Sequence, residues 1–472
     1  PFDYAQDKPF DYAQGRPQGE AWTGYSGGHG AGRFDPYLAD LLSREEKLRW
    51  EMESLRRELR LLEADEGPIL RSRVELHSDQ PQALARLAEL SQAYEEVVER
   101  LRLVAPDWLE AHSATLFSMQ ALRRTAMAYL SVRWACLSYY VLGEMLVTFY
   151  LDTQRLTVHR RSLNAYDRLA LRQCTYPAGE FRELIYRGTV RGHRAPGDPG
   201  RTYLQHLYRL LIPPEAEDLG EDNLLLIAPH GPLHGLAFQA LLADEKPLVT
   251  RVPLTYVPSL SALQLLLREL AGNDSIRRVL ACGLSDFGSQ ASSLPHTADE
   301  VTALREVLRE QLNVLWGSEA TREALLRLSD TEDLAGYDVI HFATHAVLDH
   351  LAPSQSRVLL ADDSLTLADI LNLRLRARMV VLSACEGAMG QQYPGDEIMG
   401  LARAFFLAGA RTVVASLWSV EDVSTGEFMG RFYRRLGAGE GVAQALRAAQ
   451  VEMAAEGYSP YQWAPFIAIG LP

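Results

Sequence analysis

Apolar residues near the start of the chain recur at helical spacing. They alternate steps of four and three residues: Leu48, Met52, Leu55, Leu59 and Leu62. Arg and Glu fill most positions between them, which predicts a long amphipathic helix that ends at Gly67-Pro68. The same stepping returns between Leu87 and Val104. We therefore expect two helices that pack as an antiparallel hairpin, with no sign of a 34-residue helical repeat.

Short apolar runs replace this spacing in the rest of the chain. We interpret six of them as buried strands: residues 224–228, 279–283, 338–344, 379–384, 412–418 and 465–470. Segments with helical spacing separate most of these runs. The alternation predicts an α/β fold with a mainly parallel sheet flanked by helices. The carboxyl ends of parallel strands meet at one edge, where such sheets place their active sites.

One longer apolar stretch, from Trp134 to Leu151, has the composition of a membrane span. Gly143-Glu144 interrupts it midway, and alternating polar and apolar residues follow it. This pattern favours a β-hairpin of the core over a transmembrane helix. We expect no contact with a membrane.

The shifts in pattern suggest four parts of the chain. Residues 1–36 repeat PFDYAQ and then become rich in Gly, so we expect a disordered low-complexity leader and assign it no function. Residues 37–131 form the helical hairpin region. Residues 132–330 and 331–472 form the first and second halves of the α/β part.

Composition narrows the class of protein. The 472 residues include 47% hydrophobic and 23% charged residues, a balance typical of globular proteins. The formal net charge of -14 argues against direct binding of nucleic acid. The four cysteines are scattered, without zinc-site spacing, and no secretion signal opens the sequence. These features predict a cytoplasmic protein that needs no metal or other cofactor.

Two of the predicted strands run directly into reactive side chains. The run DVIHFAT leads into His345, and the run MVVLSA leads into Cys385. If these strands are parallel neighbours, both side chains emerge at the same edge of the sheet. An imidazole beside a thiol withdraws its proton and makes it a nucleophile, so the pair is a candidate Cys-His dyad.

The other cysteines and histidines favour plainer interpretations. Free cysteines are most often small buried residues, which is our expectation for three of them: Cys136, Cys174 and Cys282. Histidine His341, inside the strand, reads as a core group with its own partners, and His350 as a solvated loop residue. His230 and His234 are four apart, but Gly231-Pro232 places them in a loop without a third metal ligand.

Several motifs together resemble one known family. They are DVIHFATH (338–345), SQSRVLL (354–360), VVLSACEG (380–387), LARAFFLAGARTVVASLWSV (401–420) and ALRAAQ (445–450). In this order they resemble the signatures of the CHAT family, whose caspase-like domains are often fused to tetratricopeptide repeats. The upstream pieces LLLIAPHGPLHGLAFQAL and LTYVPSLSAL are also similar to that family, so the resemblance covers roughly residues 135–472.

The resemblance implies a caspase-haemoglobinase-like fold, with a degenerate first half packed beside a catalytic second half. It implies that His345 is the general base and acid, that Cys385 is the nucleophile, and that the backbone N–H groups of Ala346 and Cys385 bind the oxyanion. The sequence departs from the family at three places. Ala346 replaces the usual Gly, CEG replaces a CET-like run, and PHG replaces PDG.

The predicted function is that of a cysteine endopeptidase that cleaves a protein or peptide through a thioester. Four acidic residues are candidates for a pocket that selects a basic side chain, although a solvated role is the commoner one for each: Asp362, Asp363, Asp396 and Asp422. A regulatory protein partner is expected at the N-terminal helices. Two alternatives stay open, a catalytically silent signalling scaffold and an acyltransferase with the same nucleophile.

Overall fold

The fold is described from a computed structural model of residues 1–472. The structure describes residues 76–104, 119–130, 132–175, 199–268, 276–288, 291, 293–348, 355–387, 396–418, 420 and 422–472, together with single helical positions between 37 and 55. The predicted leader at 1–36 and the predicted helix end at 67–68 lie outside the described residues.

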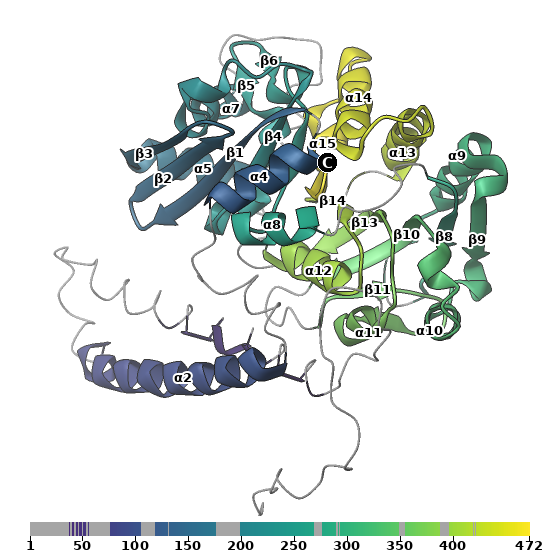
Figure 1. The fold of residues 1–472 in the computed structure, drawn as a ribbon, viewed down its shortest axis with the longest axis horizontal. Coiled ribbons are helices and arrows are strands. Elements are labelled where there is room, and N and C mark those ends of the chain that lie inside the picture. The colour runs from purple at the N-terminus through teal and green to yellow at the C-terminus, as the bar shows by residue number, and fades with distance from the viewer. Residues whose placement is uncertain are drawn as a thin grey trace, which may run out of the picture. The chain divides into compact units, whose positions relative to one another are not determined.

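A 13-stranded sheet is the centre of the described part of the chain (Figure 1). Its main path, from one edge to the other, is β12 (Ser364–Thr366), β11 (Arg357–Leu359), β10 (Val339–Leu348), β13 (Met379–Gly387), β14 (Thr412–Ser416), β15 (Phe466–Gly470), β7 (Leu254–Tyr256), β4 (Asn223–Ala228), β1 (Arg133–Leu142), β2 (Met145–Asp152) and β3 (Leu156–Ser162). Strand β8 (Val279–Gly283) pairs with β10 beside this path, and β9 (Leu312–Trp316) pairs with β8.

Parallel pairing predominates in the sheet. The pairs β10–β13, β10–β8, β8–β9, β13–β14, β1–β4, β4–β7 and β7–β15 are parallel, and the antiparallel pairs lie at the two edges and at β14–β15. The predicted α/β class with a mainly parallel sheet is confirmed. All six predicted strands exist, because strands buried on both faces read as continuous apolar runs.

The two parts of the sheet meet at the last strand. Strand β15 pairs antiparallel with β14 over five residues on one side, and its Ile469 pairs with Tyr256 of β7 on the other. Strands β8 and β9 come from the range that the sequence assigns to the first half, yet they lie beside β10. The proposed domain ranges stay predictions.

Helices cover both faces of the sheet. On one side of β10, His341 reaches α9 (Thr297–Leu308) and α13 (Asp422–Gly437); on the other, the Phe342 ring packs 6.0 Å from that of Phe405 in α12 (Asp396–Leu407). The remaining helices of this part are α10 (Arg322–Asp330), α11 (Leu367–Asn372), α14 (Val442–Ala455) and α15 (Pro460–Trp463). In the β1 region the covering helices are α4 (Met119–Tyr129), α5 (Ala165–Thr175), α7 (Pro199–Leu211) and α8 (Leu260–Arg268).

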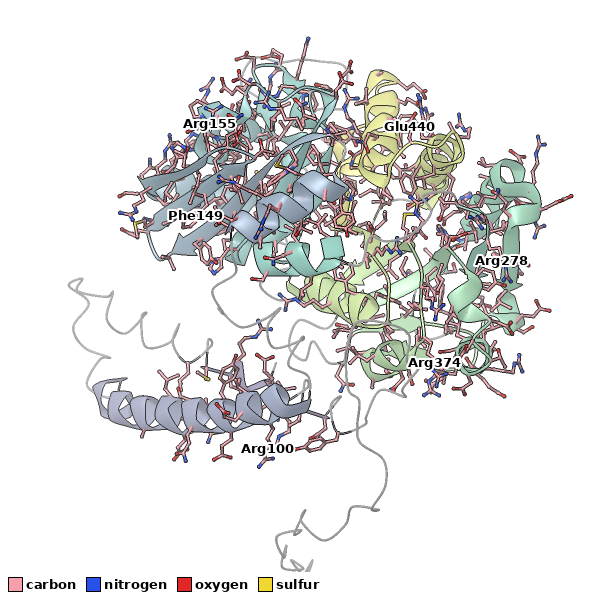
Figure 2. The ribbon with its side chains drawn as sticks, in the orientation of Figure 1. Arg100, Phe149, Arg155, Arg278, Arg374 and Glu440 are labelled. Carbon is pink, nitrogen blue, oxygen red and sulfur yellow. The ribbon has the colours of Figure 1, made fainter. Side chains whose placement is uncertain are left out.

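The apolar stretch from Trp134 to Leu151 is the predicted β-hairpin. Strands β1 and β2 pair from Leu142 and Met145 outward, and Gly143 takes φ +59° in the two-residue turn, a conformation that favours glycine. Phe149, labelled in Figure 2, packs edge-on against Tyr140 across the pair. None of the helices that the structure describes is both long enough and apolar enough to span a bilayer.

Both predicted N-terminal helices exist where the structure describes them. Helical residues occur between 37 and 55, and α2 (Leu76–Val104) begins 11 residues before the apolar stripe that predicts it. The Tyr94 hydroxyl of α2 donates to Glu45 at 3.0 Å. This contact and the burial of Leu90 and Val97 show that the apolar stripe of α2 packs against other residues.

Candidate functional site

Strands β10 and β13 bring the two halves of the predicted dyad together along the backbone. They are parallel neighbours, as the sequence predicts, and Ala346 of β10 pairs with Cys385 of β13. His345 pairs with Ala384, the residue before the cysteine. His345 and Cys385 therefore occupy diagonal positions on adjacent strands, with Cα atoms about 6 Å apart. Because successive residues of a strand alternate between faces, regular pairing at this point directs the two side chains to opposite faces of the sheet.

A β-bulge determines this register. The ladder pairs Phe342 with Leu382 but His345 with Ala384, so three steps along β10 match two steps along β13. Without the extra residue, His345 would stand directly opposite Cys385. Bulges bend a strand and redirect the side chains that follow, and they are frequent beside active sites. The bulge at Ala343-Thr344 is thus the local feature that sets the position of the histidine.

The surroundings of His345 are closed. Its side chain is 2% exposed, and its ring lies 4.6 Å from the ring of Phe287, in the loop after β8. The sequence predicts that the strand ends at His345, whereas β10 continues to Leu348 and pairs with β11 at Ala346. The apolar residues after the histidine extend the strand, so the imidazole lies inside the sheet rather than in an open loop.

Cys385 also lies within its strand. Strand β13 continues past the predicted end at 384 to Gly387, and the side chain of Cys385 is outside the described residues. The other three cysteines are buried, as expected. Burial raises the pKa of the Cys136 and Cys282 thiols to about 12, so neither is a nucleophile at neutral pH.

His341 is a fully buried core group with two partners, which confirms the plainer interpretation. Its Nε2 lies 2.9 Å from the carboxyl of Glu300 in α9, and its Nδ1 lies 3.0 Å from the hydroxyl of Tyr433 in α13. Ser383 of β13 donates to the same carboxyl at 3.2 Å. We call these four residues, Glu300, His341, Ser383 and Tyr433, the Glu300 cluster; sequence analysis did not identify it. The sequence does hold one signal of it: Glu300 stands four residues before Leu304 and eight before Leu308, so its carboxyl lies on the apolar face of the helix.

The remaining histidines have separate environments. The backbone N–H of Val141 donates to His230 Nδ1 at 3.2 Å, and His234 Nδ1 donates to the Gly231 carbonyl at 3.0 Å. Within the described ranges, no three His, Cys, Asp or Glu side chains gather in a way that suits a metal ion. His350 lies outside the described residues.

The acidic candidates are placed differently from one another. Although partial burial raises the pKa of Asp362, the N–H groups of Arg322 and Glu323 hold it below its usual value, so Asp362 caps the start of α10. Asp363 is exposed in the turn between β11 and β12 and accepts from the N–H of Ser364. Asp396 and Asp422 are the first residues of α12 and α13, and their side chains lie outside the described residues. A substrate pocket built on any of them stays a prediction.

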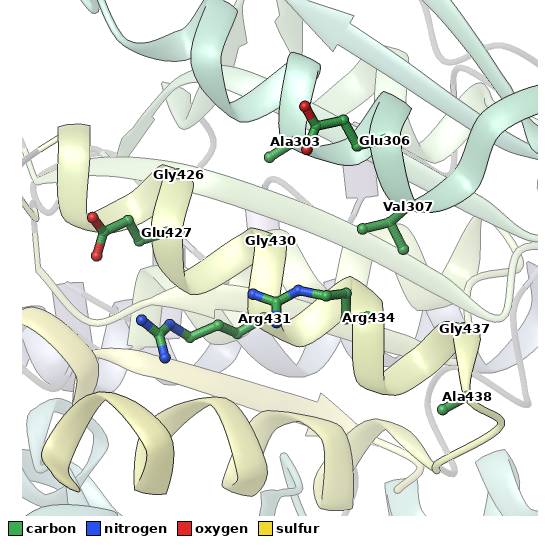
Figure 3. Close-up of a pocket in the computed structure, with 10 residues that line it drawn as sticks. All are labelled: Ala303, Glu306, Val307, Gly426, Glu427, Gly430, Arg431, Arg434, Gly437 and Ala438. Carbon is green, nitrogen blue, oxygen red and sulfur yellow. The ribbon is translucent and has the colours of Figure 1, made fainter. Parts of the chain in front are cut away.

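A groove of about 740 Å³ lies between α9 and α13 (Figure 3). Its walls include Ala303 and Val307 from α9 and Gly430 and Arg431 from α13. No lining residue belongs to β10 or β13, so this groove is not part of the candidate dyad.

Comparisons with known proteins identify the family to which the C-terminal part of the chain is similar. A profile of the CHAT domain matches residues 201–471, more than half of the sequence. Tetratricopeptide repeat protein 28 is 38% identical in Mus musculus and 36% identical in Homo sapiens, in each case over 108 residues. The aligned part is 22% of this chain and 4% of those proteins, so the chain spans only a small fraction of these relatives.

Solved structures give more distant matches. The Saccharomyces cerevisiae separase-securin complex aligns with a TM-score of 0.44 and 12% identity, over 81% of this chain and 32% of that chain. The Arg-specific cysteine proteinase gingipain R aligns with a TM-score of 0.37 and 12% identity, over 62% of this chain and 74% of that chain.

Proposed function

The chain belongs to the CHAT family, and we propose that it is a cysteine endopeptidase in which Cys385 is the nucleophile and His345 the general base and acid. The observation that supports the proposal is the parallel pairing of β10 with β13, which brings the backbones of these residues side by side; a local change in the strands must turn the two side chains to one face. A caspase-like fold and a cytosolic location, where thiols stay reduced, accompany the proposal.

The reaction proceeds in two steps. His345 accepts the thiol proton of Cys385, the sulfur attacks the peptide carbonyl, and the amine leaves with the proton that the imidazole returns. Water, deprotonated by His345, then attacks the thioester and releases the acid and the free thiol. The thioester splits one difficult hydrolysis into two easier ones, and the residues named supply every proton transfer.

The proposed oxyanion donors are the N–H groups of Ala346 and Cys385. These two residues are ladder partners, so their backbones lie side by side. Alanine keeps the N–H that glycine would supply, which makes Ala346 compatible with the role. Each donor typically contributes a hundredfold or more to the rate in acyl transfer, roughly 3 kcal/mol.

Regulation by a partner is part of the proposal. His345 and Ala346 are 2% and 0% exposed, and β11 covers the outer edge of β10 at this point. A peptide carbonyl needs open space beside the sulfur and the imidazole, so the strands must separate locally before substrate binds. We propose that a protein bound to the N-terminal helices favours this opening.

Thiol alkylation combined with cleavage tests the proposal. Iodoacetamide labelling of Cys385, followed by peptide mass spectrometry, should show a pH midpoint below the about 8.5 of an ordinary thiol. His345→Ala should slow labelling and raise the midpoint, whereas His159→Ala, at a surface contact with Glu215, should change neither. A proteome-derived peptide library, incubated with the wild type, should yield new termini that disappear in Cys385→Ser.

The alternative is a caspase-like scaffold without catalysis, which the burial of His345 favours. A scaffold predicts that His345→Ala leaves the labelling rate and its pH midpoint unchanged and that no peptide is cleaved. Labelling that depends on His345 without cleavage, but with transfer of an acyl group to an added amine, would instead indicate an acyltransferase.

A further inference from the structure

The Glu300 cluster lies between helices α9 and α13 and the two strands of the candidate dyad, and it takes no part in the proposed chemistry. Its four residues are almost completely buried, with exposures of 2% for Glu300 and Ser383 and 0% for His341 and Tyr433. They come from the two helices α9 and α13 and from the two strands that carry His345 and Cys385.

The hydrogen bonds of the cluster converge on the Glu300 carboxyl. The Tyr433 hydroxyl donates to His341 Nδ1, the opposite nitrogen of His341 donates to Glu300, and Ser383 donates to the second oxygen of Glu300. Burial and the charge of Glu300 raise the pKa of Tyr433 well above its usual value, so the phenol stays a donor. Every polar group therefore has a partner that suits it.

The cluster also touches the bulge. The Ser383 hydroxyl lies 3.2 Å from the carbonyl oxygen of Phe342, the last residue of β10 before the extra residue. The Ser383 hydroxyl has one proton to donate, and its oxygen lies at the same 3.2 Å donor–acceptor distance from this carbonyl and from the Glu300 carboxyl, so Ser383 links the cluster to the residue before the bulge.

Close helix packing holds the carboxyl in place. Figure 3 shows α9 and α13 side by side, with Gly426 and Gly430 along α13. A Cβ atom at Gly426 would lie 3.7 Å from the Glu300 Cα, and one at Gly430 would lie 3.5 Å from the Ala303 Cβ. The glycines allow this short separation, which brings Glu300 and Tyr433 to the same histidine.

Stability alone does not account for a buried carboxyl here. Apolar side chains of similar volume usually stabilise a core as well as a buried polar network does, while loss of one partner is costly. We propose that the Glu300 cluster is a positioning network that fixes the bulge of β10 and so sets the diagonal position of His345 relative to Cys385. The inference rests on the proposed function of this dyad.

Tyr433→Phe tests the network with minimal change of shape. It removes the hydroxyl that orients His341 and should slow iodoacetamide labelling of Cys385 by about tenfold, with the pH midpoint shifted to higher pH. Tyr139→Phe is the matched control, because it removes one buried hydroxyl bond, to the Leu211 carbonyl, far along the sheet. It should leave the rate and the midpoint unchanged. Glu300→Gln, which keeps the size of the side chain, should act in the same direction as Tyr433→Phe.

A double-mutant cycle separates this inference from the proposed function. If the network acts through the imidazole, Tyr433→Phe adds no further slowing in a His345→Ala background. Equal labelling in Tyr433→Phe and Tyr139→Phe, or equal slowing with and without His345, overturns the positioning role and leaves the dyad intact. If His345→Ala labels as fast as the wild type, the dyad fails, and the positioning role fails with it.

Discussion

The hydroxyl of Thr344 donates a 2.7 Å hydrogen bond to the backbone carbonyl of Leu359, and both residues are buried. Thr344 belongs to the bulge of β10, and Leu359 is the last residue of β11. This contact, together with the β10–β11 ladder, ties the edge hairpin of β11 and β12 to the strand that carries His345.

Thr344→Val should destabilise the protein while it keeps the shape of the side chain. The variant leaves the Leu359 carbonyl without this buried donor, at a cost of roughly 1–2 kcal/mol in the free energy of unfolding. Thr250→Val is the control, because Thr250 donates to the Pro247 carbonyl over the same distance at a half-buried site. Urea denaturation measures both; a loss at Thr344 no larger than at Thr250 would argue against a special role for this contact.

The ion pair between α10 and α11 should make stability depend on pH. Arg322 donates to both oxygens of Asp369, at 2.9 and 2.5 Å, and Thr366 donates to one of them. Although burial raises the pKa of Asp369, these donors lower it below the ordinary 3.8. The stabilisation is therefore present above pH 3.8 and is lost as the pH falls through the folded-state pKa.

Asp369→Asn should accordingly cost about 2 kcal/mol at pH 7 and progressively less in acid. Urea midpoints of the wild type and the variant, measured between pH 7 and pH 2, should converge towards the acid end. Asp330→Asn, at an exposed residue of α10, should show no such convergence. A difference at Asp369 that is constant with pH would contradict the ion-pair explanation.

Gly409→Ala should be strongly destabilising, because two constraints coincide there. Gly409 has φ +108°, and an added Cβ would overlap the backbone carbonyl of Leu375. We expect a loss of about 3 kcal/mol or more. Gly439→Ala, with φ +90° and no atom within 4 Å of the added Cβ, should lose only about 1 kcal/mol. Thermal unfolding compares the two, and similar losses would exclude the steric explanation.

Thiol reagents should distinguish Cys385 from the other cysteines in the folded protein. Burial makes Cys136, Cys174 and Cys282 inaccessible and raises the pKa of the first and last of them. At pH 8, mass spectrometry should find these three unmodified in the native protein and modified in urea. Modification of Cys282 before unfolding would mean that the sheet opens at β8.

The order of elements follows from the sequence because burial leaves a direct pattern in it. Strands such as Val279–Gly283 are covered on both faces and read as uninterrupted apolar runs. The hairpin turn at Gly143 is equally readable, since its conformation favours glycine. These features are local, and local features are the ones that a single sequence records.

The bulge of β10 leaves no such pattern. Ala343 and Thr344 continue the composition of the strand, and the extra residue is visible only against its partner β13. For the same reason the sequence places His345 at a strand end, although β11 pairs with the residue that follows. The start of α2 was also missed, because residues 76–86, which include Pro81, carry no apolar stripe.

The central place of β15 has a consequence for synthesis on the ribosome. Until residues 466–470 emerge from the exit tunnel, β14 and β7 each keep an unpaired edge, and such edges invite pairing with other chains. The nascent chain thus keeps the β7 edge open from about residue 256 onward and the β14 edge open from residue 416 onward. Chaperone contact during this interval would protect both edges until the late strand joins them.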